Sequence, residues 1–154
     1  MAWPYHRRMN RLRVLRLLFA LALGSTSLAA CAGDCVPQVR DGWVRVPPAG
    51  LPMAAGFGDF DNGCDTAATI VSASSPAFEE TTVHATRIEN GISRMRAVPE
   101  LRVAAHSVAQ FEPGGLHLML MRPKHALQAG DKVPVEFRLA DGRVVRAEFT
   151  VRKL

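Results

Sequence analysis

The sequence predicts an all-β protein, and two observations support that prediction. From residue 36 onward helix signals are scarce, whereas short runs of alternating apolar and polar residues recur. Gly, Pro, Asn and Asp bound these runs, as they do at turns between strands. We therefore expect a Greek-key β-sandwich of about eight or nine strands in one domain, because 154 residues suit a single domain.

The predicted strands follow one another with short connections. They are Gln38 to Val46, Gly56 to Asn62, Ala67 to Ser74, Thr81 to Ile88, Ile92 to Val98, Leu101 to Phe111, Leu116 to Arg122, Val133 to Leu139 and Val144 to Arg152. The clearest turns between them are Pro47-Pro48-Ala49-Gly50, Glu112-Pro113-Gly114-Gly115 and Asp141-Gly142.

The dipeptide Asn90-Gly91 predicts a β-hairpin, since Asn-Gly favours a two-residue turn. With these two residues as the loop, Thr86 lies opposite Met95 and His84 lies opposite Ala97. His84 and Met95 then become diagonal neighbours on one face of the hairpin. A slip of one residue would move Met95 to the opposite face.

Charge is distributed unevenly along the chain. The 19 Lys and Arg exceed the 14 Asp and Glu, which gives a formal net charge of +5. Residues 1–30 contain five Arg and no acid, so the rest of the chain has a formal charge of 14 − 14 = 0. A neutral body lacks the basic surface that phosphate binding requires, so we do not expect a nucleic-acid partner.

The N-terminus is typical of an export signal. An Arg-rich stretch to Arg16 precedes the apolar run Leu17 to Leu23 and the small residues Gly24 to Ala30. The run is too short to span a membrane. The segment Leu28-Ala29-Ala30-Cys31 resembles the bacterial lipobox, which predicts lipidation of Cys31; plain cleavage near Ala30 is the alternative.

These signals define the expected organisation and location. Residues 1–30 form a lipoprotein-type signal peptide, residues 31–37 an anchor and short tether, and residues 38–154 the β-sandwich. The protein is expected on the periplasmic side of the bacterial envelope, attached to the membrane by lipid. Ala32 gives no Asp of the kind associated with inner-membrane retention, which favours the outer membrane by analogy.

Cysteine usage predicts one disulfide. Export places the protein in an oxidising compartment, and lipidation of Cys31 leaves an even pair, Cys35 and Cys64. A bond between them closes a loop of about thirty residues and stabilises the fold by about 3 kcal/mol in the chain-entropy model. A Cys-based metal site would need more thiols, and no Cys-x-x-Cys is present.

The residue types unusual for a plain scaffold are His and Met in neighbouring strands, namely His84, Met95, His117 and Met119. Strand alternation places His117 and Met119 on one face. Thioether and imidazole ligands select Cu(I), with Cu(II) as the alternative ion, whereas carboxylates favour hard cations. Taken singly, a strand Met is more often core filler and a lone His more often structural.

The spacing favours the metal interpretation. His84, ten residues, Met95, twenty-one residues, then His117-Leu118-Met119 matches the motif of the periplasmic copper chaperones of the PCu(A)C type. Residues 38–152 resemble that family more widely, at Trp43, Ala54-Ala55-Gly56-Phe57, Ser74-Ser75-Pro76-Ala77, Met95-Arg96-Ala97-Val98 and Pro113 to Met121. The resemblance implies a cupredoxin-like sandwich, Cu(I) carriage in the periplasm and delivery toward the copper site of cytochrome c oxidase.

Two features depart from the family pattern. Many relatives have a Met shortly after the first His, whereas Ala85 and Thr86 follow His84 here. The Cys35 and Cys64 pair is not part of the family's metal motif, so the disulfide is an independent prediction.

Four further residues are weaker candidates. Met121 and Met53 are possible additional metal ligands. Met121 shares the strand face of Met119, and Met53 in the Pro-rich loop could line a copper entrance. For both residues, however, a packing role in the core is favoured. His106 and His125 are expected to face solvent.

The expected protein is a monomeric copper carrier, not an enzyme, whose partner is a copper-accepting subunit or assembly factor of a respiratory oxidase. Two rivals remain at this point, namely a structural envelope lipoprotein without metal and a blue-copper electron carrier. The second needs a Cys thiolate beside two His. Enzyme signatures such as Gly-x-Ser-x-Gly, His-Glu-x-x-His and a glycine-rich phosphate loop are missing from the sequence.

Overall fold

The computed structural model describes residues 35–47 and 51–153, and within these residues it contains ten strands and no helix. The all-β prediction is confirmed. No helix in this part of the chain could cross a membrane. The predicted signal peptide, Cys31 and most of the turn after Pro47 lie outside the described residues. The strands are β1 (Gln38–Val46), β2 (Met53–Asn62), β3 (Ala68–Ser74), β4 (Phe78–Glu89), β5 (Ile92–Ala97), β6 (Leu101–Val103), β7 (Ser107–Phe111), β8 (Leu116–Pro123), β9 (Lys132–Leu139) and β10 (Val144–Lys153).

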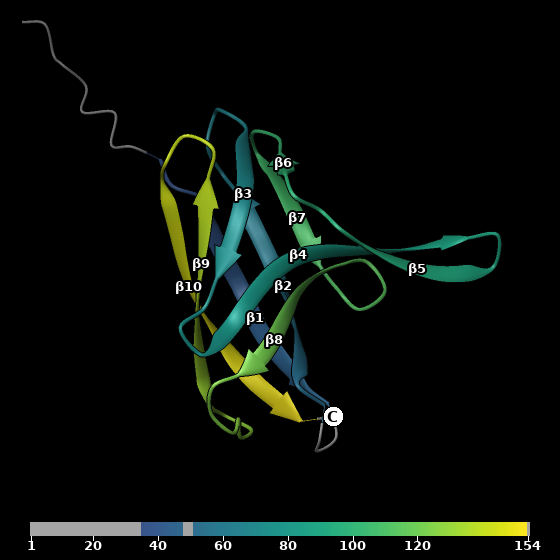
Figure 1. The fold of residues 1–154 in the computed structure, drawn as a ribbon. Coiled ribbons are helices and arrows are strands. Elements are labelled where there is room, and N and C mark those ends of the chain that lie inside the picture. Colours follow the sequence, from purple (N-terminus) through teal and green to yellow (C-terminus); the bar gives the residue numbers. More distant parts are fainter. Residues whose placement is uncertain (1–34, 48–50, 154) are drawn as a thin grey trace, which may run out of the picture. The chain divides into compact units, whose positions relative to one another are not determined.

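All ten strands belong to one sheet that folds over on itself into two layers (Figure 1). The strand order is β5-β4-β8-β7-β2-β1-β10-β9-β3-β6, and β8 also pairs with β2. Phe137 on β9 lies between the layers, with its ring centroid 5.5 Å from that of Phe60 on β2 and 6.1 Å from that of Phe111 on β7. Strands that are distant in the sheet therefore share one apolar core.

Three predicted strands differ from the structure by more than one residue at a boundary. β2 begins at Met53 and β4 at Phe78, earlier than expected. The predicted strand from 101 to 111 is two strands, β6 and β7, because the backbone turns at His106, where φ is 51°. The buried Asn62 amide satisfies the carbonyls of this turn, donating to Val103 O at 3.2 Å and Ala104 O at 2.9 Å.

The predicted turns that can be assessed are present. Gly115 N donates to Glu112 O, and Gly114 between them has a φ of 86°, a conformation that favours glycine. At the β9–β10 hairpin, Gly142 N donates to Leu139 O.

The disulfide between Cys35 and Cys64 is confirmed, with the two Cα atoms 5.7 Å apart. It joins the segment before β1 to the loop after β2. Because Cys64 is buried, the bond attaches this segment directly to the core.

The β4–β5 hairpin has the predicted register. Glu89 pairs with Ile92, Thr86 with Met95 and His84 with Ala97. Asn90 and Gly91 have φ values of 54° and 75°, as a tight turn requires. Beyond the segment where β4 pairs with β8, the hairpin projects from the rest of the sheet (Figure 1).

Candidate metal centre

The alternation of β8 divides its side chains between the core and the opposite face. Leu118 and Leu120 are fully buried in the core. The residues between and beside them, His117, Met119 and Met121, lie on the other face, as period-two alternation requires. Side chains with soft and borderline donor atoms are thus held on one face of a central strand.

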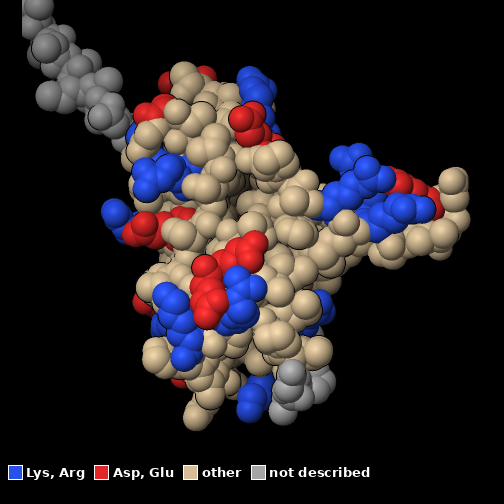
Figure 2. Space-filling model, viewed as in Figure 1, with Lys and Arg blue, Asp and Glu red and all other residues tan. Residues whose placement is uncertain are grey.

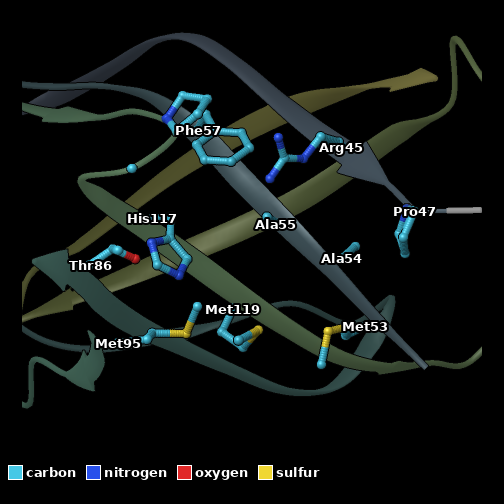
Figure 3. A pocket seen from close by; sticks show the side chains of 12 residues that line it. Arg45, Pro47, Met53, Ala54, Ala55, Phe57, Thr86, Met95, His117 and Met119 are labelled. Carbon is cyan, nitrogen blue, oxygen red and sulfur yellow. The ribbon is translucent and has the colours of Figure 1, made fainter. Parts of the chain in front are cut away.

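Three of the four predicted ligands line one pocket of about 220 Å³, namely His117, Met119 and Met95 (Figure 3). The neighbouring strands explain this. Met119 pairs with Thr82 on β4 and with Ala55 on β2, and Thr86 pairs with Met95. Ala55 is small, so it leaves space beside the Met119 side chain. Met53, Met95, Met119 and His117 surround this space in Figure 3.

The His117 ring is held with one nitrogen available for an ion. Its Nδ1 lies 3.1 Å from Gly115 O, and a carbonyl can only accept, so Nδ1 carries the proton. Nε2 of the neutral ring then has a free lone pair. This atom is buried and has no hydrogen-bond partner within the described residues. A backbone contact that orients the ring and leaves the other nitrogen unpaired is the usual arrangement of a metal-binding histidine.

His84 lies beside His117 rather than in the pocket lining. The two residues pair directly across β4 and β8, with ring centroids 6.0 Å apart. His84 Nδ1 is also buried and without a hydrogen-bond partner in this part of the chain. Two unpaired ring nitrogens on adjacent strands are costly unless something ligates them.

The protonation of His84 follows from this setting. Burial lowers the pKa of His84 below its ordinary value of 6.5, and the neighbouring His117 lowers it further, whereas Glu80 acts in the opposite direction. The neutral ring, which is the form that binds a metal, is therefore favoured.

This lowered pKa predicts a pH dependence of stability for the copper-free protein. Below pH 6.5 the unfolded chain takes up a proton that folded His84 resists. We expect the contribution of His84 to the free energy of unfolding to be constant above that pH and to be lost as the pH falls toward the lowered pKa. In thermal denaturation from neutral to mildly acidic pH, the stability of His84→Gln should fall less steeply with acid than that of wild type, and the exposed His125→Gln is the matched control. Equal slopes in His84→Gln and wild type would contradict the assignment.

The weaker candidates separate in the structure. Met53 is the first residue of β2 and not the loop residue that was expected, and its side chain lines the pocket with 36% exposure. Met121 pairs with Met53 but is not in the pocket lining. His106 and His125 are exposed, as expected, and His106 pairs with Asp65 at 3.0 Å.

Sequence reasoning missed Arg45 and Phe57 as pocket residues. The Arg45 guanidinium lies over the Phe57 ring, 5.2 Å from its centroid, and that ring is 6.5 Å from the His117 ring. The alternation of Met53, Ala55 and Phe57 along β2 is the signal that could have identified this wall of the pocket. A cationic guanidinium here weakens the attraction of the pocket for a metal ion.

The family is shown by a match over most of the chain. The family model described as "Putative lipoprotein LpqE-like" matches residues 37–151. The chain belongs to this family. Over 106 residues it is 40% identical to "Putative lipoprotein Lxx21020" of Leifsonia xyli subsp. xyli, which covers 68% of this chain and 63% of that protein. The chain thus spans less than two thirds of the length of this relative.

Solved structures agree on the fold. The copper-bound PCuAC domain from PmoF2 superposes with a TM-score of 0.62 at 16% identity, over 75% of this chain and 92% of that domain. The solution structure of the Cu(I) form of DR1885 from Deinococcus radiodurans gives a TM-score of 0.61 at 26% identity, over 79% of this chain and 83% of that protein. The predicted resemblance to PCu(A)C domains and the cupredoxin-like sandwich are confirmed.

Proposed function

We propose that this protein carries Cu(I) in the periplasm and binds it as cargo with His84, Met95, His117 and Met119. The observation that carries the proposal is the unpaired, buried Nε2 of His117 in a pocket lined by Met95 and Met119. Neutral imidazole and thioether ligands match the preference of Cu(I).

The exposure of the ligands suits transfer rather than storage. His117 is buried at 5% exposure, whereas Met95 is 51% exposed on the projecting hairpin. The outer ligand can therefore be replaced by a thiolate of an acceptor while the inner histidine still holds the ion. Such stepwise exchange is favourable because thiolates bind Cu(I) more strongly than thioethers.

The destination that we propose is the copper site of cytochrome c oxidase, reached through a copper-accepting subunit or assembly factor. The resemblance to PCu(A)C chaperones supports this choice. Cu(I) titration of the exported protein in competition with a chromogenic chelator tests the carrier function. We expect one ion per chain, and a chain that competes for no Cu(I) would refute the proposal.

The disulfide argues against a blue-copper electron carrier. Such a site requires a Cys thiolate, and both Cys35 and Cys64 are committed to the disulfide. We therefore expect the copper-loaded protein to lack the intense visible band of a copper–thiolate bond. A strong band of this kind in the absorption spectrum would overturn the chaperone assignment.

A lipid on Cys31 would hold the carrier at the membrane. The lipobox-like segment and the lipoprotein family support this part of the proposal. Wild-type protein should sediment with membranes, and Cys31→Ala should release a soluble form or block processing. Fractionation that finds wild-type protein entirely soluble with an unmodified N-terminus would contradict the anchor.

A further inference from the structure

The β4–β5 hairpin has features that metal binding alone does not require. All six residues of β5 are exposed. Ile88 and Ile92, which lie near the turn, are 80% and 56% exposed. These are unusual positions for large apolar side chains on a projecting arm, and Met95 shares the arm.

The projecting part of the hairpin, residues 84–97, which we call the arm, carries Arg87, Arg94 and Arg96 against one acid, Glu89. Glu89 is shared, at 3.4 Å from Arg94 and 3.2 Å from Arg96, and Arg87 has no ion pair within the described residues. The formal charge of the arm is 3 − 1 = +2. Figure 2 shows basic side chains gathered along this arm behind an uncharged tip.

One backbone edge of the hairpin is unpaired. β5 is the first strand in the sheet order, so within the described residues it has a neighbour on one side only. Val98 N donates to Val83 O at 2.8 Å, which fixes which hairpin pairs are hydrogen-bonded. By antiparallel alternation, the N–H groups of Ser93, Met95 and Ala97 point away from β4 toward the open edge.

We propose that this open edge of β5 is the docking site for an acidic, extended segment of the copper acceptor, which adds to the sheet as a further strand. The identity of the partner as the acceptor rests on the proposed function. Backbone hydrogen bonds would come from the free edge, and the carboxylates would pair with Arg94 and Arg96. Met95 lies between these arginines in the sequence but on the opposite face of β5, so a strand added along the edge would also pass beside this proposed copper ligand.

Charge favours this partner over a second copy of the chain. Two β5 edges pairing with each other would bring the arginines of both copies together, and like charges on an edge strand oppose such pairing. A lipid surface would suit the isoleucine tip and the arginines, yet it offers no strand to the unpaired edge.

The test uses the exported protein and two synthetic peptides of equal length, one alternating Asp and Thr and the other Lys and Thr. Binding is followed by amide NMR shifts at low and high salt. We expect only the acidic peptide to bind. Its binding should be weak and should decrease at high salt, and the amide shifts that it causes should centre on residues 93–97. Equal binding of the basic peptide, or shifts elsewhere on the sheet, would overturn the proposal.

Matched variants separate specific docking from bulk charge. Arg94→Glu/Arg96→Glu should weaken binding of the acidic peptide about tenfold. Arg102→Glu/Arg138→Glu makes the same charge change on exposed residues of β6 and β9 and should weaken this binding less than about twofold. Ser93→Pro removes an edge N–H without touching the β4–β5 ladder and should also weaken binding. Equal losses in both charge variants, or no effect of Ser93→Pro, would refute strand addition.

Two further arms keep the alternatives apart. The hairpin should not bind vesicles of phosphatidylglycerol and phosphatidylcholine. If the protein binds these vesicles but not the acidic peptide, and Ile88→Ser/Ile92→Ser abolishes vesicle binding, the hairpin contacts a membrane and the proposal is wrong. Cu(I) affinity should be unchanged in the arginine and Ser93 variants. A wild type that binds the acidic peptide but no Cu(I) would overturn the proposed function while supporting the docking edge.

Discussion

Replacing Met95 or Met119 by Ile is expected to lower the Cu(I) affinity of the protein by at least about tenfold for each substitution. Loss of groups that merely support a metal ligand costs about 10 to 100-fold in affinity, so loss of a ligand should cost no less. Isoleucine keeps most of the apolar volume, suits a β-strand and removes only the sulfur. The free energy of unfolding should therefore change by less than about 1.5 kcal/mol. Chelator competition and thermal denaturation measure the two quantities.

Met121→Ile provides the matched control for this prediction. Met121 lies on the same strand and face as Met119 but does not line the pocket. Its replacement should leave Cu(I) affinity within about twofold, since volume is conserved and no pocket sulfur is lost. If the Met95 and Met119 variants unfold while copper binding of the folded fraction is unchanged, these residues are packing residues and the carrier function is wrong.

Removing the disulfide through Cys35→Ser/Cys64→Ser should lower the free energy of unfolding by about 3 kcal/mol. The bond closes a loop with a sequence separation of 29 residues, whose freedom in the unfolded chain is restored when the bond is lost. For a domain of this size the melting temperature should fall by about 10 °C or more. Denaturant unfolding and calorimetry measure the change.

Copper binding is the internal control for the disulfide variant. Neither cysteine lines the pocket, so Cu(I) affinity below the lowered melting temperature should match that of wild type. A variant as stable as wild type would show that the bond contributes little. A folded variant that has lost copper would show that the cysteines take part in the site.

The parts of the site predictable from sequence were those set by local rules. Asn90-Gly91 fixes the hairpin turn, and the turn fixes the register that puts His84 and Met95 on one face. Strand alternation likewise relates His117 to Met119. The fold class followed from the same period-two pattern, and β1 was predicted at its observed bounds.

Features that depend on contacts distant in sequence were not predictable. The turn at His106 depends on the buried amide of Asn62, forty-two residues from Ala104, so an apparently continuous strand breaks there. Met53 enters the site because β2 extends to pair with Met121 on β8. The position of Arg45 over Phe57 is a cross-strand contact that neither local sequence reveals.

X-ray absorption at the copper K-edge of the Cu(I)-loaded protein tests the central claim most directly. We predict both nitrogen and sulfur in the coordination sphere, with sulfur at about 2.3 Å and nitrogen at about 2.0 Å, taking the lengths of sulfur and nitrogen ligands on zinc as the guide. The sulfur contribution should disappear in Met95→Ile/Met119→Ile. Wild-type copper coordinated by nitrogen and oxygen alone, or sulfur that persists in the double variant, would contradict the site proposed here.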